Sequence, residues 1–494
     1  MEKKYAESAL SFFQQQGVLI GEDEIVARQD ASPMALLEAQ RQYRGAIQPR
    51  FVTDEKFEER LTELKQRHAS ASRQIADDMD ASIDLMALTE EISDNEDVLN
   101  TAENSPVIRL INAILAEAVK EKASDIHIET FEKTLIIRFR IDGVLIPVLQ
   151  PARKLSAMLI SRIKVMARLD IAEKRLPQDG RISLRLGSRA IDVRVSTIPA
   201  RHGERIVMRL LDKTNLAFGL AELGMQDDDL ARLKQQIRQP HGIILVTGPT
   251  GSGKSTTLYA MLSALNSNER NILTVEDPIE YELEGIGQTQ VNSAVDMTFA
   301  RGLRAILRQD PDVVMIGEIR DGETAKIAVQ ASLTGHLVLS TLHTNSACGA
   351  ISRLQDMGVE PYLIASSLTG VLAQRLVRRL CPDCRIARPV SAVEKALFSA
   401  AGPLPSRLWH PQGCDRCRQS GYLGRIAIHE VMTIDRALRQ AIGEMQGESG
   451  MESLLRQQAR SLRQNGLLRA MQGDTSLEEV LRVTAEQTHS GEPG

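Results

Sequence analysis

The chain has 494 residues, which at roughly 150 residues per domain predicts about three domains. Aromatic residues make up only 3% of it, so aliphatic side chains must fill the cores. Its 60 basic and 65 acidic residues leave a net charge of -5, which argues against a protein that coats nucleic acid, because such proteins are strongly basic.

The sequence also limits where the protein acts. No apolar run approaches the roughly 20 residues that cross a bilayer, and the first residues have no signal-peptide core. We therefore expect a cytoplasmic protein that is at most peripheral to a membrane. Four of its five cysteines fall into two Cys-x-x-Cys pairs, a pattern that indicates metal binding in a reducing compartment.

The first 220 residues divide into three predicted parts. Residues 1–90 show patches of helical apolar spacing and no catalytic constellation, which predicts a helical module. Residues 91–105 are acidic and rich in helix breakers, which is typical of a linker. From Pro106 a helix is expected, and period-two alternation from Asp125 predicts strands, with a hairpin turn at Asp142-Gly143. Residues 106–220 are therefore predicted to form an α+β module.

Residues 221–494 alternate short β-rich runs with helical segments, which predicts an α/β domain with a mostly parallel sheet. The strongest motif follows the apolar run 243–246 and matches G-x-x-x-x-G-K-[ST] in full. Its glycines allow backbone N–H groups to surround phosphate oxygens, Lys254 supplies a charge to the β- and γ-phosphates, and Ser255 offers a hydroxyl to Mg²⁺. The predicted site for ATP and magnesium comprises Gly248, Pro249, Thr250, Gly251, Ser252, Gly253, Lys254, Ser255 and Thr256.

Three more β-type runs end in polar residues, and ligands of open α/β sheets bind beyond the carboxyl ends of the strands. The run 272–275 leads into Glu276 and Glu280, and the run 313–316 leads into Glu318. Glu318 replaces the usual aspartate as the predicted Mg²⁺-binding acid. We expect Glu280 to polarise the attacking water and Glu276 to shape the nucleotide and metal environment. The alternative is that these acids are solvated loop carboxylates.

Two histidines flank the next β-type run, residues 337–340. We interpret His336 and His343 as sensors of the γ-phosphate, although a lone histidine is more often structural.

The cysteine pairs are separated by 29 residues and supply the four thiolates that a closed, tetrahedral zinc site requires. The predicted zinc ligands are Cys381, Cys384, Cys414 and Cys417, within an insertion at residues 376–430. Between Arg375 and Glu430 ten basic residues stand against four acidic ones. This excess suits an anionic phospholipid or an acidic partner, or is an ordinary solvated surface.

Together these segments resemble a known family. The phosphate loop, residues 276–280, residues 308–321 and residues 334–345 resemble the secretion traffic ATPases, the motors of type II secretion and of type IV pilus assembly. Residues 123–129 and 177–181 extend the resemblance over most of the chain, and the type II secretion branch is the nearest match.

The resemblance implies a P-loop, RecA-like domain that hydrolyses ATP between the subunits of a homo-hexameric ring. Arginines of the preceding α+β module reach the nucleotide in this family, and the matching positions here are Arg140, Arg194 and Arg209. Arginine suits this role because its planar fork stabilises charge spread over phosphoryl oxygens. The alternative is an arginine-rich, solvated sheet face.

The resemblance also implies partners and a task. Residues 1–90 would dock onto an inner-membrane platform protein, placing the motor on the cytoplasmic face of that membrane. ATP hydrolysis would drive pseudopilus assembly and protein export across the outer membrane. The alternatives are a type IV pilus assembly ATPase, a nucleotide-gated scaffold and a DNA-translocating ATPase. With one Trp and six Tyr, the chain offers few stacking platforms for nucleic acid.

Overall fold

The computed structural model describes residues 18–20, 25–28, 31, 49–53, 56–57, 106–186, 189–212, 219–398 and 405–485. The chain forms two compact units, one of Met1–Ile141 with Leu145–Thr214 and one of Asp142–Val144 with Asn215–Gly494. Among the described residues, no helix combines the length and the apolar character that a membrane crossing demands.

The described part of the N-terminal region is a small sheet. Strand β2 (Ile25–Arg28) pairs antiparallel with β1 (Val18–Ile20) and parallel with β3 (Arg50–Val52). The sequence predicted a helical module for residues 1–90, and it missed these three strands, because strands of three and four residues are too short to leave a periodic signal. The predicted linker, residues 91–105, lies outside the described residues.

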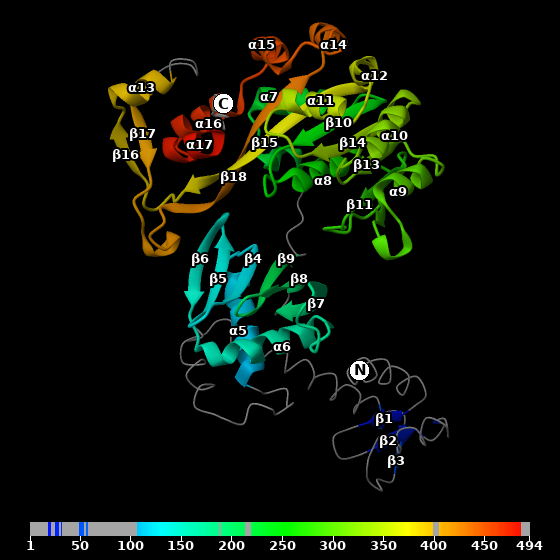
Figure 1. Cartoon of the computed structure of the whole chain (residues 1–494), viewed down its shortest axis with the longest axis vertical. Helices are drawn as coiled ribbons and strands as arrows, with labels where there is room; N and C mark the ends of the chain where they lie inside the picture. Colours follow the sequence, from blue (N-terminus) through cyan, green and yellow to red (C-terminus); the bar gives the residue numbers. More distant parts are fainter. Residues whose placement is uncertain are drawn as a thin grey trace. The chain divides into compact units, whose positions relative to one another are not determined.

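The rest of the first unit is the predicted α+β module. Its six-stranded sheet has the order β6-β5-β4-β9-β8-β7. Helices α5 and α6 share one apolar core with the strands, and it includes Leu110 of α5, Ile126 of β4 and Phe139 of β5. The elements are α5 (Pro106–Lys120), β4 (Asp125–Thr130), β5 (Leu135–Ile141), β6 (Val144–Leu149), α6 (Ser156–Met166), β7 (Gln178–Leu186), β8 (Arg189–Ala200) and β9 (Gly203–Asp212) (Figure 1).

The second unit is built on a seven-stranded sheet of order β12-β11-β13-β14-β10-β15-β18. Every pairing in it is parallel except that of β15 with β18, which confirms the predicted mostly parallel sheet. The strands are β10 (Gly242–Thr247), β11 (Ile272–Glu276), β12 (Gly287–Gln290), β13 (Val313–Ile316), β14 (Leu337–Leu342), β15 (Leu368–Leu380) and β18 (Tyr422–Thr433).

Helices cover both faces of this sheet, so β10 is buried along its whole length. Alternate β10 residues belong to different cores, with Ile243 and Leu245 in one and Ile244 and Val246 in the other. The helices are α7 (Asp227–Ile237), α8 (Lys254–Leu265), α9 (Phe299–Ile306), α10 (Gly322–Leu333), α11 (Ala347–Asp356), α12 (Pro361–Ser367), α14 (Arg436–Gly443), α15 (Glu448–Gln458), α16 (Leu462–Gln472) and α17 (Leu477–Thr484) (Figure 1).

The cysteine-bearing segment extends from two strands of the main sheet. Residues 376–380 and 422–430 of the predicted insertion belong to β15 and β18, so the part outside the sheet starts at Cys381. It contains β16 (Ile386–Pro389), α13 (Ala392–Phe398) and β17 (Arg407–His410). Leu408 packs in a small core with residues of α16 and α17, which ties this segment to the C-terminal helices.

Candidate active site

The phosphate loop connects the buried strand β10 to helix α8, as the sequence predicts. Gly248, Gly251 and Gly253 have φ angles of +152°, +79° and +88°, a region that side chains other than glycine rarely adopt. Lys254 is the first residue of α8, and the exposed residues Ser255 and Thr256 follow it in the first turn. The loop therefore ends at a helix N-terminus, where the aligned peptide dipoles favour an anion.

Lys254 is largely buried and points back into the loop. Its Nζ donates to the carbonyl oxygens of Gly248 at 2.8 Å and Pro249 at 3.1 Å. Burial lowers the pKa of the Lys254 amine, and the charge of Glu318 acts in the opposite direction. The lysine of the motif and the acid after β13 thus influence each other electrostatically.

Glu318 lies two residues beyond the end of β13 and contacts two basic side chains. It accepts a hydrogen bond from Arg320, and its Oε2 lies 3.4 Å from Nε2 of His343, which follows β14. Burial lowers the pKa of His343, and the charge of Lys254 lowers it further. The structure therefore brings Lys254, Glu318 and His343 together at the carboxyl edge of the sheet.

Arg320 is a site residue to which the sequence reasoning gave no role. Besides Glu318 it contacts Asp277, with Nη1 at 3.4 Å from the carboxylate, and its guanidinium lies over the Phe299 ring. The available signal was its position two residues after Glu318 in the same strand-end segment.

His336 does not share this edge. It precedes β14, whereas His343 follows it, and six strand residues at about 3.3 Å each separate the two ends. Its Nδ1 lies 2.8 Å from the carbonyl oxygen of Ala331 at the end of α10. This corrects the interpretation of both histidines as sensors: of the two, His343 alone is placed beside Glu318.

Glu276 is the buried centre of a polar network. Its carboxylate accepts hydrogen bonds from the hydroxyl of Tyr259, from Thr274 at 2.6 Å and from Gln288 at 3.0 Å. The Tyr259 hydroxyl in turn accepts the backbone N–H of Glu280 at 3.1 Å. Tyr259 belongs to α8, so this network connects the helix behind the phosphate loop to the segment that carries Glu280.

The three predicted arginine fingers lie in one row across the sheet of the first unit. Asp125 on β4 pairs with Arg140 on one side and Arg209 on the other, and Arg209 pairs with Arg194. Directly opposed strand residues share a face, so these side chains project together. The Asp125 carboxylate lies 2.9 Å from Nε of Arg209 and 3.8 Å from Nε of Arg140.

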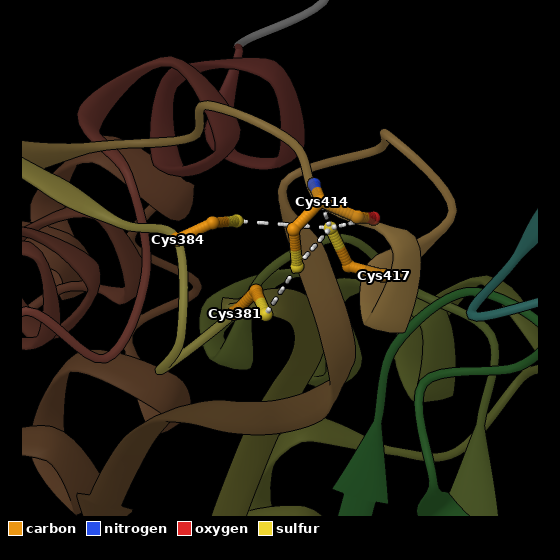
Figure 2. A group of neighbouring side chains, drawn as sticks. All are labelled: Cys381, Cys384, Cys414 and Cys417. Atoms are coloured by element: carbon orange, nitrogen blue, oxygen red, sulfur yellow. Dashed lines mark hydrogen bonds between the residues drawn. The ribbon is translucent and has the colours of Figure 1, made fainter.

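The four predicted zinc ligands converge (Figure 2). Their sulfur atoms all lie within 4.8 Å of one another, and three of the sulfur pairs are 3.7 to 3.8 Å apart. Tetrahedral zinc with bonds of about 2.3 Å requires sulfur atoms about 3.8 Å apart, so the donor set fits this ion. Backbone N–H groups of Cys414 and Gly421 also donate to the Cys417 sulfur, each at 3.2 Å, which favours a thiolate.

Comparison with known proteins finds matches over most of the chain. The family model described as Type II/IV secretion system protein matches residues 100–482, and a second model, described as a domain of GSPII protein E, matches residues 10–64. The chain is 60% identical to "Type II secretion system ATPase E" of Vibrio cholerae, over 92% of this chain and 90% of that protein. It is 61% identical to "Putative type II secretion system protein E" of Escherichia coli, over 96% of each.

Solved structures agree on the fold. The ATPase DotB of Legionella pneumophila is similar with a TM-score of 0.57 at 22% identity, covering 76% of this chain and 95% of that one. The pilus retraction motor PilT with bound ADP has a TM-score of 0.51 at 26% identity, covering 76% and 96%. These matches confirm the predicted RecA-like fold and the predicted resemblance. The chain belongs to the type II/IV secretion system protein family.

Proposed function

We propose that this chain is the ATP-hydrolysing motor of a type II secretion system. The observation that carries the proposal is the convergence of Lys254, Glu318 and His343 beyond the carboxyl ends of β10, β13 and β14. The two relatives named for type II secretion each match more than nine-tenths of this chain. These matches support assigning the chain to a type II secretion system. Hydrolysis would drive pseudopilus assembly and protein export across the outer membrane.

Each residue of the site has a proposed role. The loop residues 248–253 and Thr256 hold the phosphates, with Lys254 as their counter-charge. Ser255 and Glu318 would hold Mg²⁺, which would supply positive charge to the β- and γ-phosphates. Glu280 orients and polarises the attacking water.

Two further residues act around this centre. His343, directly after β14, senses the γ-phosphate. Glu276 acts through Tyr259. Hydrogen bonds from Tyr259, Thr274 and Gln288 fix the Glu276 carboxylate. The Tyr259 hydroxyl in turn holds the backbone N–H of Glu280.

We propose that Arg140, Arg194 and Arg209 complete the site of a neighbouring subunit in a homo-hexameric ring. The side chains of Arg209 and Arg140 remain 55% and 36% exposed although both face Asp125. The carboxylate thus orients the guanidinium groups without removing them from solvent. A pre-oriented arginine loses less conformational entropy when it meets a phosphoryl group.

The cysteine cluster is proposed to hold one structural zinc ion. Four thiolates would fill all four tetrahedral positions and would leave none for water or substrate. The zinc would stabilise the segment from Cys381 to Cys417, whose basic residues suit an anionic phospholipid or an acidic partner.

The remaining assignments follow the family matches. Residues 1–90 form the docking module for an inner-membrane platform protein, supported by the domain match at 10–64. Residues 91–105 are the linker, 106–220 the arginine-bearing module and 221–494 the ATPase domain. The motor would work on the cytoplasmic face of the inner membrane.

The runner-up is a type IV pilus assembly ATPase, favoured by the similarity to PilT. Complementation separates the two in a strain that makes both machines and lacks both motors. Our proposal predicts restored exoprotein secretion and no restored pili, and restored pili without secretion would contradict it. The same assay with Lys254→Ala should restore neither, and purified Lys254→Ala should lack Mg²⁺-dependent ATP turnover that the unchanged chain shows.

A further inference from the structure

Gln374, a buried glutamine of β15, contacts the phosphate loop. Gln374 is 3% exposed, and its side-chain amide has two polar partners around the loop. Its Nε2 donates to the carbonyl oxygen of Ser252 at 2.7 Å, and its Oε1 accepts the Thr257 hydroxyl at 2.6 Å. One side chain thereby joins the loop and the first turn of α8.

The fit between β15 and the loop is close. A Cβ atom at Gly248 would lie 2.3 Å from the Gln374 carbonyl oxygen, and one at Gly253 would lie 2.8 Å from its Nε2. Real Cβ atoms do not approach other atoms this closely. Gly248 is therefore required by the backbone of the neighbouring strand as well as by its own φ angle, and a side chain at Gly253 would displace the Gln374 amide.

The hydrogen bond to the Ser252 carbonyl oxygen fixes the orientation of the whole peptide group between Ser252 and Gly253. A trans peptide is planar, and its C=O and N–H point in opposite directions. Holding the Ser252 carbonyl toward Gln374 therefore turns the Gly253 N–H away from β15. Phosphate loops bind their ligand through such backbone N–H groups, so the orientation of this peptide bears directly on nucleotide affinity.

We propose that Gln374 is a positioning residue of the nucleotide site: its amide holds the peptide between Ser252 and Gly253 and the first turn of α8 in the phosphate-binding geometry. Without this contact the peptide can rotate, and each binding event must restore its orientation. This inference rests on the assignment of the loop to ATP. It predicts a loss of affinity and a smaller change in the chemical step, since Gln374 does not touch the reacting atoms.

The test uses the full-length chain with Gln374→Met, which keeps the length of the side chain and removes its polar atoms. We expect the Kd for ADP and the KM for ATP to rise about tenfold, while kcat changes less than about threefold. Thr257→Val should raise the Kd by less, and Thr257→Ser should restore it because the hydroxyl is kept. Adding Thr257→Val to Gln374→Met should raise the Kd no further.

The matched control is Gln236→Met. Gln236 on α7 is a buried glutamine that donates to β18, to the Met432 carbonyl at 3.2 Å and to Thr433 at 3.0 Å. A role in packing alone predicts equal losses of melting temperature in both Gln→Met variants and an unchanged Kd for ADP, which would overturn the proposal. An unchanged Kd in Thr257→Val would overturn it too, and so would a double variant whose Kd rises by the product of the two single effects. ADP affinity is measured without turnover, so a chain that binds ADP but hydrolyses no ATP would contradict the motor function separately.

Discussion

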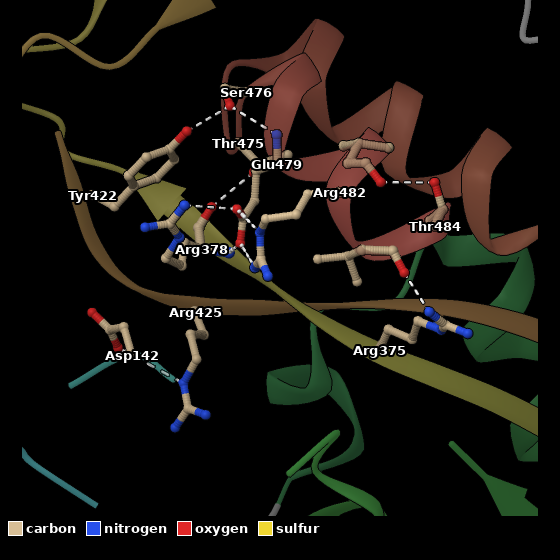
Figure 3. Close-up of polar contacts among 12 residues, drawn as sticks. Asp142, Arg375, Arg378, Tyr422, Arg425, Thr475, Ser476, Glu479, Arg482 and Thr484 are labelled. Carbon is tan, nitrogen blue, oxygen red and sulfur yellow. Dashed lines mark hydrogen bonds and ion pairs between the residues drawn. The ribbon is translucent and has the colours of Figure 1, made fainter. Parts of the chain in front are cut away.

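Replacing Glu479 by glutamine should release the C-terminal helix from the main sheet. Glu479 lies on α17 with 1% of its side chain exposed, and it binds two arginines (Figure 3). It accepts the backbone N–H of Arg378 on β15 at 3.1 Å and the Arg378 guanidinium at 2.9 Å. Arg482, one turn further along α17, donates twice, at 2.8 and 2.6 Å. The substitution keeps the shape and removes the charge.

The magnitude follows from the pKa of the carboxyl. Burial alone would raise the pKa of Glu479, but hydrogen bonds from Arg482 and Arg378 lower it from 4.5 to about 2. This difference corresponds to about 3 kcal/mol of stabilisation. Because the folded-state pKa is the lower one, the stabilisation is complete above about pH 4.5 and is lost as the pH falls toward 2.

Hydrogen exchange of residues 477–484 measures this effect. At pH 7 we expect Glu479→Gln to speed exchange there by about a hundredfold, since the loss of about 3 kcal/mol favours local opening. Glu478→Gln is the control, because that side chain is 62% exposed. The difference in unfolding free energy between the unchanged chain and Glu479→Gln should shrink below pH 4.5. Equal exchange in the two variants, or a difference independent of pH, would refute the reasoning.

Two other predictions concern the active site and the cysteine cluster. Tyr259→Phe should lower kcat up to about tenfold with little change in the KM for ATP, because the Glu280 backbone loses its hydrogen-bond acceptor; steady-state kinetics with an unchanged kcat would argue against this network. Cys414→Ser should lose zinc in elemental analysis and speed exchange in residues 381–421, whereas Cys348→Ser should keep the metal. Purified unchanged chain without zinc would disprove the ligand assignment.

Local patterns were enough to predict the parts of the site that lie along a short stretch of chain. The phosphate loop was identified because its strand, glycines and helix are contiguous, and Glu318 because it follows a short apolar run. The convergence of Lys254 and Glu318 was also predictable, since parallel strands bring their carboxyl ends to one edge. The cysteine cluster was predictable from the spacing of its two pairs.

Contacts between distant segments could not be predicted in this way. Gln374 lies 117 residues from Thr257 and 122 from Ser252, and nothing in the sequence around it indicates that strand β15 pairs with β10. The link from Tyr259 to Glu276 and Glu280 depends likewise on how α8 packs against the end of β11. His336 was misplaced although its position directly before the run of β14 already puts it at the amino end of that strand, away from the edge where ligands bind.

Mixing two inactive variants tests the central claim, that ATP bound by one subunit's loop is cleaved with arginines of its neighbour. Lys254→Ala and Arg209→Ala rings should each lack most ATP turnover. In a random 1:1 mixed ring, about one site in four should combine an intact Lys254 with an intact Arg209 of the adjacent subunit. We predict that mixing restores about a quarter of the turnover of the unchanged ring. Mixed rings as inactive as their parents would contradict the shared site.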